Sequence, residues 1–304
     1  DTIGIVTPIT KYTFQPMYPN EIPEVVKKAF YISSTGRPGP VLINLPKDVQ
    51  TDKGKMVFPE KIEIRGYNPI VPIDSSQIEK AADFLLKSER PIVWGGGGVL
   101  LSDGSKQLQS VAELLMSPVV TTLKGKGAFP ENHPLALGPI GMHGTSEANK
   151  IICETDCLLA VGVRFSDRST GKFEEFCKDG KIIHIDIDPS EIGKNKKVEL
   201  SIVGDVATTL NELYRSLARR IVKKEEDYPW LRRVEEVREM FRERKEITRS
   251  NLVGVKVVKK IREILPANGI LATGVGKHQM WGELFYKVIK PRTWLTSTGY
   301  GTMG

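Results

Sequence analysis

Short apolar runs alternate with amphipathic helical stretches from Asp74 to Val222, and this alternation strongly limits how the chain can fold. The first helix can be capped by Asp74 or Ser75, and the apolar runs have the length and character of buried strands. Strands that alternate with helices of this length are typical of a doubly wound parallel sheet. The expected strands are 91–94, 118–122, 157–162, 181–187 and 200–203, and the expected helices are 74–87, 104–116, 144–153 and 205–222.

Two shorter α/β segments flank this middle region. Before it we predict a helix at 21–34 and a strand at 41–45, and after it helices at 254–264 and 277–287 with strands at 269–273 and 293–296. Residues 51–72 contain three prolines without sustained periodicity, which predicts an interdomain linker. We therefore expect an internal piece of a larger α/β protein, divided into residues 1–50, 51–72, 73–225 and 226–304.

The net charge of +7 raises the question of a nucleic-acid partner. Much of the basic excess lies between Arg215 and Arg249, where acidic residues are interleaved with it. Mixed charges at helical spacing indicate a solvated helix face with i,i+4 ion pairs rather than a stripe that binds phosphates. We therefore expect no nucleic-acid partner.

The cysteine count and the apolar segments bear on location. Three cysteines in 304 residues argue against a disulfide framework and favour a reducing compartment, the cytoplasm or an organelle interior. Cys153, Cys157 and Cys177 could form a zinc site with His184, but their spacing fits no common ligand pattern and packed thiols are the preferred interpretation. Glycine or proline interrupts every apolar segment, so we expect no membrane span.

Ligand-type residues follow each predicted strand of the middle region. The groups are Gly95–Gly98, Thr121–Gly127, Gly138–Gly144, Gly162–Gly171, Asp186 with Asp188, and Asp205. Each alone could be an ordinary loop, and the glycine run could be a tight turn, because Leu100 stands where a dinucleotide fingerprint has glycine. Ligands of doubly wound sheets bind at the carboxyl ends of strands, so the whole set favours a long cofactor across that edge.

Several strings resemble the acetohydroxyacid synthase family, also called acetolactate synthase. They are Ser34–Val49, Met142-His-Gly144, Gly162–Arg168, Gly276-Lys-His-Gln-Met-Trp281, Lys290–Trp294 and Gly301-Thr-Met-Gly304, in order along nearly the whole chain. The strings of the middle region are shared in part with pyruvate oxidase and glyoxylate carboligase. The resemblance implies a complete FAD-binding middle domain between partial pyrimidine-binding and diphosphate-binding domains.

The resemblance also implies cofactor contacts. Positions that match the family's FAD contacts are Arg37, Gly95, Gly96, Gly97, Thr122, Leu123, Met142, His143, Gly162, Val163, Arg164, Asp167, Asp186, Ile187, Asp205 and Val206. Positions that match its thiamine diphosphate contacts are Gly276, Lys277, His278, Gly301 and Met303. Lys277 replaces a usual glutamine, which leaves the local geometry of the diphosphate loop open, and Ser166 replaces a usual aspartate in the Gly162–Arg168 string.

For the substrate, Arg168 matches the arginine that engages a carboxylate, and Lys47 and Met142 match residues of the substrate channel. A surface lysine is the alternative for Lys47. The catalytic glutamate and the Mg²⁺ ligands of the family match no position here, so we expect no metal ligand in residues 1–304 and no activity of this piece alone.

The implied activity is that of a transferase in the biosynthesis of valine, leucine and isoleucine. Pyruvate is decarboxylated on thiamine diphosphate and condensed with a second 2-oxoacid, pyruvate or 2-oxobutanoate, while FAD does no net redox work. A homodimer or homotetramer, a regulatory small subunit and a cytoplasmic location are further expectations. The alternatives are a related flavin and thiamine enzyme (pyruvate oxidase or glyoxylate carboligase) and a non-catalytic nucleotide-binding module.

Overall fold

The computed structural model describes residues 1–221, 228–249 and 253–302, with side chains omitted between 243 and 249. The chain forms two compact units, Asp1–Val71 and Pro72–Gly304. No helix within the described residues is long and apolar enough to cross a membrane. The predicted four-part division stays a prediction.

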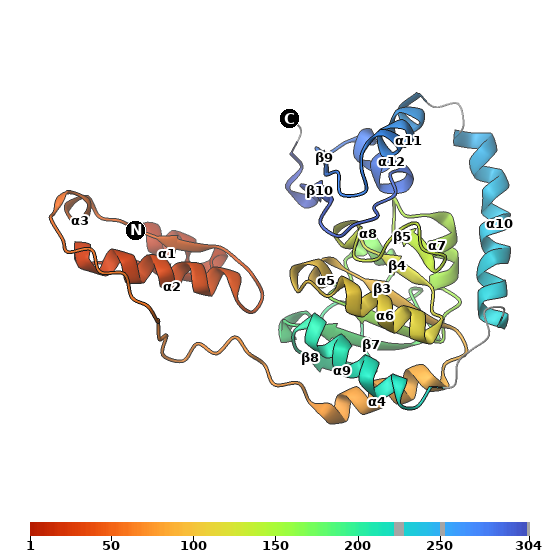
Figure 1. The fold of residues 1–304 in the computed structure, drawn as a ribbon, viewed down its shortest axis with the longest axis horizontal. Helices are drawn as coiled ribbons and strands as arrows, with labels where there is room; N and C mark the ends of the chain where they lie inside the picture. The colour runs from red at the N-terminus through yellow and green to blue at the C-terminus, as the bar shows by residue number, and fades with distance from the viewer. Residues whose placement is uncertain (222–227, 250–252, 303–304) are drawn as a thin grey trace. The chain divides into compact units, whose positions relative to one another are not determined.

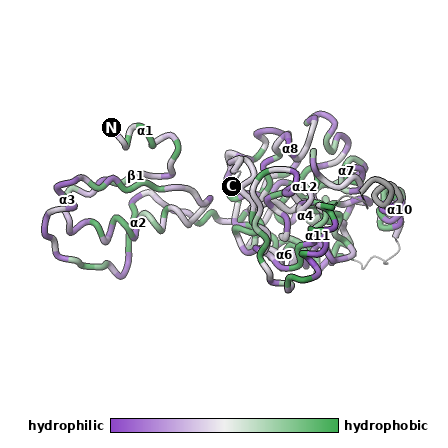
Figure 2. Tube along the Cα trace, turned by 90° about the horizontal axis from the view of Figure 1, so that it is seen from above, coloured by the Kyte–Doolittle hydropathy of each residue, from purple (hydrophilic) through white to green (hydrophobic). Residues whose placement is uncertain are grey.

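The first unit is a small α/β segment. Strands β1 (Tyr12–Phe14) and β2 (Val41–Ile43) pair in parallel, and helix α2 (Ile22–Ser34) packs beside them. Pro23 lies in the first turn of α2, where its missing N–H costs no hydrogen bond, as the sequence predicts. Hydrophobic and hydrophilic residues alternate along α2 (Figure 2). The remaining helices are α1 (Thr2–Val6), η1 (Thr7–Ile9), η2 (Pro19–Glu21) and α3 (Lys47–Thr51).

The second unit is built on a parallel sheet of six strands. These are β3 (Pro91–Gly95), β4 (Val119–Thr121), β5 (Ala136–Pro139), β6 (Cys157–Val161), β7 (Lys181–Asp186) and β8 (Leu200–Val203). Their spatial order is β5-β4-β3-β6-β7-β8, so the order reverses between β3 and β6. The reversal identifies a doubly wound sheet, and the five predicted strands are confirmed. Strand β5 was not predicted, because Gly138 and Pro139 are unusual in a strand and are tolerated at this sheet edge.

Helices cover both faces of this sheet (Figure 1). On one face α4 (Ser75–Lys87), α6 (Ser105–Leu115) and α9 (Val206–Ala218) enclose one apolar cluster, and on the other α7 (Ser146–Ile152) and α10 (Pro229–Arg249) enclose a second. Asp74 and Asp205 cap α4 and α9 by accepting hydrogen bonds from Ser76 N and Thr208 N. The predicted helices of the middle region are therefore confirmed to within a few residues.

Helix α10 carries most of the described part of the charged segment. Its apolar side is buried, with Trp230, Val234 and Val237 in the second cluster and Trp230 Nε1 donating to the Pro91 carbonyl at 3.0 Å. Its charged side is exposed, as predicted, but the ion pairs that the structure resolves within the helix, such as Arg233–Glu236, have i,i+3 spacing rather than the expected i,i+4. This packing ties α10 to the middle sheet.

The last part of the second unit repeats the strand and helix pattern. Helices α11 (Val253–Ile264) and α12 (Lys277–Phe285) accompany strands β9 (Leu271–Thr273) and β10 (Trp294–Thr296), which pair in parallel. The connecting short helices of the unit are α5 (Gly97–Leu101), η3 (Leu123–Gly125), α8 (Asp167–Thr170), η4 (Pro189–Glu191) and η5 (Thr298–Tyr300). A third apolar cluster of Val258, Tyr286, Val288 and Trp294 joins this part together.

All three cysteines are free thiols. Cys157 and Cys177 are buried, as packed thiols should be, and burial raises the pKa of Cys157 to about 12 and that of Cys177 to about 11. Cys153 is exposed, which differs from the packed-thiol interpretation. Over the described ranges, no group of three or more His, Cys, Asp or Glu side chains is arranged to hold a metal ion.

Candidate functional site

The reversal of strand order places the ends of β3 and β6 side by side, and the glycines there bring two backbones into contact. Gly96 N donates to Val161 O at 2.9 Å, and Gly98 N donates to Gly162 O at 3.1 Å. A Cβ atom on Gly96 would lie 2.1 Å from Gly162 O, and one on Gly98 would lie 2.7 Å from Gly162 Cα. The glycines are therefore required by this backbone contact itself, whether or not a ligand approaches.

The loop after β4 closes over the same strand end. Thr122 N donates to Gly95 O at 3.1 Å, and Thr122 Oγ1 accepts from Gly125 N at 2.9 Å. A Cβ on Gly125 would come within 2.3 Å of Gly95 O, so this approach also demands glycine. Leu123 is half-buried against the third apolar cluster. A Cβ atom added to Gly97 would lie 3.3 Å from Lys124 Cβ. Three loops thus meet around the glycine run.

A buried histidine fixes the loop that carries Arg164. His184 Nε2 donates to the Val163 carbonyl at 2.9 Å, while Val163 itself is buried. Burial lowers the pKa of His184 to about 4, so its imidazole is neutral and its Nδ1 accepts no hydrogen bond from any described residue. The exposed Arg164 side chain forms no hydrogen bond or ion pair with another described residue. Within the described part of the chain it is therefore an unpaired cation, three residues after the end of β6.

The structure brings together Met142 and Arg168, two predicted substrate-lining residues. Met142 N donates to Arg168 O at 2.9 Å, and Arg168 Nη1 lies 3.4 Å from Met142 Sδ. Gly141 permits this contact, because a Cβ there would lie 2.2 Å from Arg168 O. Asp167 Oδ1 accepts from Arg168 N, and both Asp167 and His143 are exposed. The loops after β5 and β6 therefore form one exposed polar surface.

Two of the three predicted acidic residues, Asp186 and Asp205, differ in their surroundings. Asp186 ends β7, is largely buried, and accepts a hydrogen bond from Asp188 N at 3.0 Å, with the half-buried Ile187 next to it. Asp205 accepts from Ser102 Oγ at 2.6 Å and from Thr208 N at 2.9 Å, and Val206 beside it is buried. Burial opposes ionisation of Asp205, but the hydrogen bonds from Ser102 and Thr208 outweigh it and lower its pKa. The capping of α9 is thus by itself a sufficient reason for an aspartate at position 205.

The predicted thiamine diphosphate residues lie on two neighbouring loops of the C-terminal part. Gly276 caps α12 with φ of +151°, and Lys277 and His278 are exposed in the first turn. Val275 N donates to Thr302 O at 2.9 Å, which joins this loop to the segment that follows the left-handed Gly301. Met303 lies outside the described residues.

Arg37 and Lys47 belong to the first unit. Both side chains are exposed, Arg37 in the turn after α2 and Lys47 at the first position of α3. A groove of about 410 Å³ in the same unit is lined mainly by apolar residues, including Ile22, Met56 and Phe58. Neither Arg37 nor Lys47 lines this groove, so it is separate from the predicted site.

Comparisons with known proteins place two parts of the chain in one family. Residues 78–213 match the family model described as "Thiamine pyrophosphate enzyme, central domain". Residues 274–304 match "Thiamine pyrophosphate enzyme, C-terminal TPP binding domain". The first match covers the six-stranded sheet and the loops around the glycine run, and the second covers the loops that contain Gly276 and Gly301.

Curated relatives are similar over the entire chain. A protein of Methanocaldococcus jannaschii named "Probable acetolactate synthase large subunit" is 45% identical over 313 residues, covering 100% of this chain and 53% of that protein. "Acetolactate synthase large subunit" of Corynebacterium glutamicum is 41% identical, covering 100% and 49% respectively. "Acetolactate synthase isozyme 3 large subunit" of Escherichia coli is 36% identical, covering 100% and 54%. The chain spans about half the length of the curated relatives it matches.

Proposed function

Because the chain belongs to the thiamine pyrophosphate enzymes and is homologous throughout to acetolactate synthase large subunits, we propose that it is part of an acetolactate synthase. The observation that carries this proposal is identity of 36–45% to such subunits along the whole chain. The proposed reaction joins pyruvate, after decarboxylation, to a second molecule of pyruvate or to 2-oxobutanoate. Its place is the biosynthesis of branched-chain amino acids.

The strand ends where the order reverses, between β3 and β6, have features that a long anionic cofactor such as FAD requires. The strand-order reversal is the usual ligand position in a doubly wound sheet, and the glycine run keeps bulky side chains away from it. Arg164 supplies a cation for a diphosphate, and Asp186 supplies oxygen atoms near a strand end for ribose hydroxyls. The other family-matched positions, from Gly95 to Val206, are proposed to line the same cofactor.

Thiamine diphosphate would bind at the second pair of loops. Lys277 and His278 begin α12 beside Gly276, where exposed N–H groups and a lysine favour a diphosphate. When bound, thiamine diphosphate supplies the nucleophilic carbon that pyruvate chemistry requires. The role of this chain is then to hold the diphosphate at Gly276–His278 and a substrate carboxylate at Arg168. Mg²⁺ and the catalytic glutamate are proposed to depend on parts of the enzyme beyond these residues.

Assembly and location are proposed by the same homology. The relatives are named large subunits, which supports a regulatory small subunit as partner, and we propose a homodimer or homotetramer of the large subunit. The free thiols agree with a reducing compartment, and we propose the cytoplasm. We propose no nucleic-acid or membrane partner.

A direct assay of the full-length protein tests the proposed reaction. With pyruvate, thiamine diphosphate, Mg²⁺ and FAD, we expect acetolactate to accumulate and the flavin to remain oxidised when oxygen is excluded. Bleaching of the flavin by pyruvate, with acetate or acetyl phosphate as product, would establish the pyruvate oxidase alternative instead. Failure to release carbon dioxide under any of these conditions would favour a non-catalytic nucleotide-binding module.

Arg164→Ala in the full-length protein is expected to yield colourless protein from a yellow parent. Loss of a charge-assisted hydrogen bond to the flavin diphosphate should weaken flavin binding by about tenfold to a hundredfold. Flavin content after gel filtration, read from its visible absorbance, measures this. Arg215→Ala is the matched control, because Arg215 is an exposed arginine on α9 whose ion pair in the described chain is with Glu212, and it should keep the flavin. Retained flavin in Arg164→Ala would refute the assignment of Arg164.

Arg168→Ala is expected to keep the flavin but impair turnover. Its guanidinium lies on the exposed Met142–Arg168 surface, where it can bind a carboxylate, so its loss should raise KM for pyruvate or lower kcat by about tenfold or more. Steady-state kinetics and flavin content are measured on the same preparation. A flavin-free variant with normal kinetics would show that Arg168 serves the cofactor rather than the substrate.

A further inference from the structure

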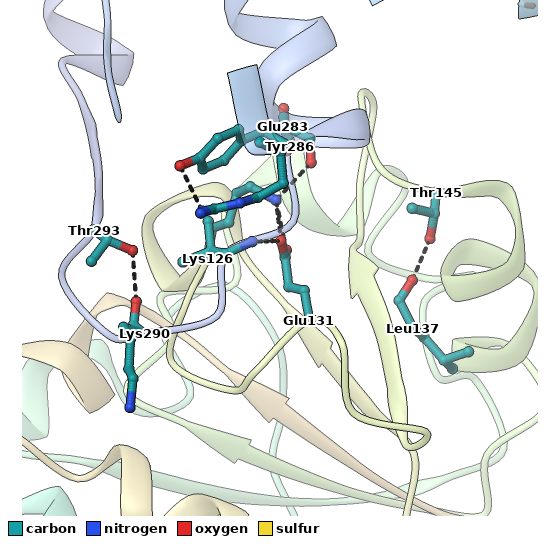
Figure 3. A network of polar contacts seen from close by, with 10 residues as sticks. Lys126, Glu131, Leu137, Thr145, Glu283, Tyr286, Lys290 and Thr293 are labelled. Carbon is teal, nitrogen blue, oxygen red and sulfur yellow. Dashed lines mark hydrogen bonds and ion pairs between the residues drawn. The ribbon is translucent and has the colours of Figure 1, made fainter. Parts of the chain in front are cut away.

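A buried ion pair lies where the middle part of the second unit meets its C-terminal part. Lys126 Nζ lies 2.6 Å from both carboxylate oxygens of Glu131, and the two side chains are 1% and 8% exposed. Lys126 Nζ also donates to the Glu283 carbonyl at 2.9 Å, as Figure 3 shows. A cation and an anion removed from water this completely need several well-placed partners, and both have them.

Most of those partners are main-chain atoms of the C-terminal part. Glu131 Oε2 accepts from Val288 N at 2.7 Å, and Glu131 N donates to Val288 O at 2.9 Å. The virtual Cβ of Gly127 lies 2.7 Å from a methyl carbon of Val288, so the two segments are in close contact. The Lys126 ammonium lies 5.6 Å from the centre of a Trp294 ring. The loop 125–131 therefore holds the chain on both sides of the end of α12.

Glu283 adds a second carboxyl group to this buried place. It is 5% exposed and lies in the last turn of α12, at the negative end of the helix dipole. Among the described residues, the charged groups in contact with the end of α12 are Lys126, paired with Glu131, and Lys259 and Arg262 from α11, which lie over the rings of Phe285 and Tyr286. The other charged residues of α11, Lys256, Lys260 and Glu263, are exposed. Lys126 is already neutralised by Glu131, so an ionised Glu283 leaves a surplus negative charge.

We propose that Lys126, Glu131 and Glu283 form a buried, pH-dependent cluster that holds α12 against the middle sheet, and that ionisation of Glu283 weakens this attachment. With Glu283 protonated, the buried cluster has one cation and one anion, and the main-chain contacts around Val288 are held. With Glu283 ionised, two carboxylates share one buried cation. The N-terminus of α12 carries Gly276, Lys277 and His278, so the attachment of α12 also sets the position of these three residues.

The direction of the pH dependence follows from the burial. Burial raises the pKa of Glu283 to about 7, the charge of Lys126 opposes this rise, and the charge of Glu131 adds to it. When α12 detaches and the carboxyl group becomes hydrated, its pKa returns to the ordinary glutamate value of 4.5. The attached state therefore binds the proton more tightly, so attachment is strongest at low pH and weakens as pH rises from 4.5 to about 7.

Hydrogen exchange of the α12 amides in the full-length protein without added cofactor tests this inference independently of the proposed function. After correction for intrinsic exchange, opening of residues 277–286 in the parent should increase about tenfold between about pH 6 and about pH 8. In Glu283→Gln, which imitates the protonated carboxyl group, the corrected opening should be equal at the two pH values. Glu263→Gln, an exposed carboxyl change on α11, should retain the pH dependence of the parent.

Two results would overturn the inference. One is a parent protein whose α12 protection is the same at the two pH values. The other is a Glu283→Gln variant with the parent's pH dependence, because another group would then be responsible. If Glu283→Gln does not fold, the parent measurement alone still decides, supported by infrared detection of a protonated carboxyl group at neutral pH that disappears at high pH.

Discussion

Lys126→Met in the full-length protein is expected to lower the free energy of unfolding by about 3–5 kcal/mol. The substitution keeps the approximate volume and apolar stem of the side chain but removes the only cation that contacts Glu131 in the described chain. Glu131 and Glu283 would then be two buried carboxyl groups without a compensating charge. Thermal or urea unfolding measured at neutral pH gives the size of the loss.

Two further variants separate the charge effect from a general effect of losing a lysine. Lys80→Met changes an exposed lysine of α4 and should alter stability by no more than about 0.5 kcal/mol. Lys126→Met combined with Glu131→Met removes both charges, and it should recover much of the stability lost in the single variant. A double variant no more stable than Lys126→Met would show that packing, and not the unpaired carboxylate, causes the loss.

Gly162→Ala is expected to destabilise the protein by about 2–5 kcal/mol, from backbone conformation and overpacking together. Gly162 has φ of +58°, and an added Cβ would lie 2.6 Å from Gly98 Cα, with the carbonyl carbon and nitrogen of Gly98 also within 3.0 Å. Because the atoms in contact are backbone, neither strand end can yield without separating β3 from β6. We also expect weaker flavin binding, since the proposed flavin site lies at the ends of β3 and β6.

Gly193→Ala isolates the conformational part of this effect. Gly193 has φ of +73°, close to that of Gly162, but a Cβ there would meet nothing within 4 Å. Its substitution should therefore cost about 1–2 kcal/mol and leave the flavin in place. Unfolding free energies of the two variants, measured under the same conditions, give the contribution of the backbone contact by difference. Equal losses would mean that the contact between Gly98 and Gly162 contributes nothing measurable.

Local signals in the sequence were sufficient for most of the fold. Apolar runs such as 91–94 and 157–162 predicted central strands, and Asp74 predicted the start of α4, because each signal is contained in a few neighbouring residues. Strand β5 carries no such signal, since two of its four residues are Gly138 and Pro139. Helix α5 was missed for a similar reason, because it begins within the glycine run, and glycine is a poor helix former.

The candidate site was harder to predict because its contacts join distant parts of the chain. The glycine run indicated a possible ligand loop, but its contact with Gly162 depends on which strands are neighbours, and local sequence does not encode that order. The bond between Met142 and Arg168 could be anticipated only through the family resemblance. Lys126 was read as part of a polar loop, and its partner Glu283 lies 157 residues away. The His184 bond to Val163 likewise has no local signature.

The contacts between loop 125–131 and the C-terminal part limit how the sequences of related chains can diverge. Two of its most buried polar contacts are made to the Glu283 carbonyl and the Val288 amide, atoms that every residue except proline provides. Substitutions at positions 283 and 288 therefore leave these contacts available, whereas Lys126 and Glu131 must change together. Related chains should thus be able to exchange C-terminal segments of different sequence and still keep this junction, provided that the two charged residues are inherited as a pair.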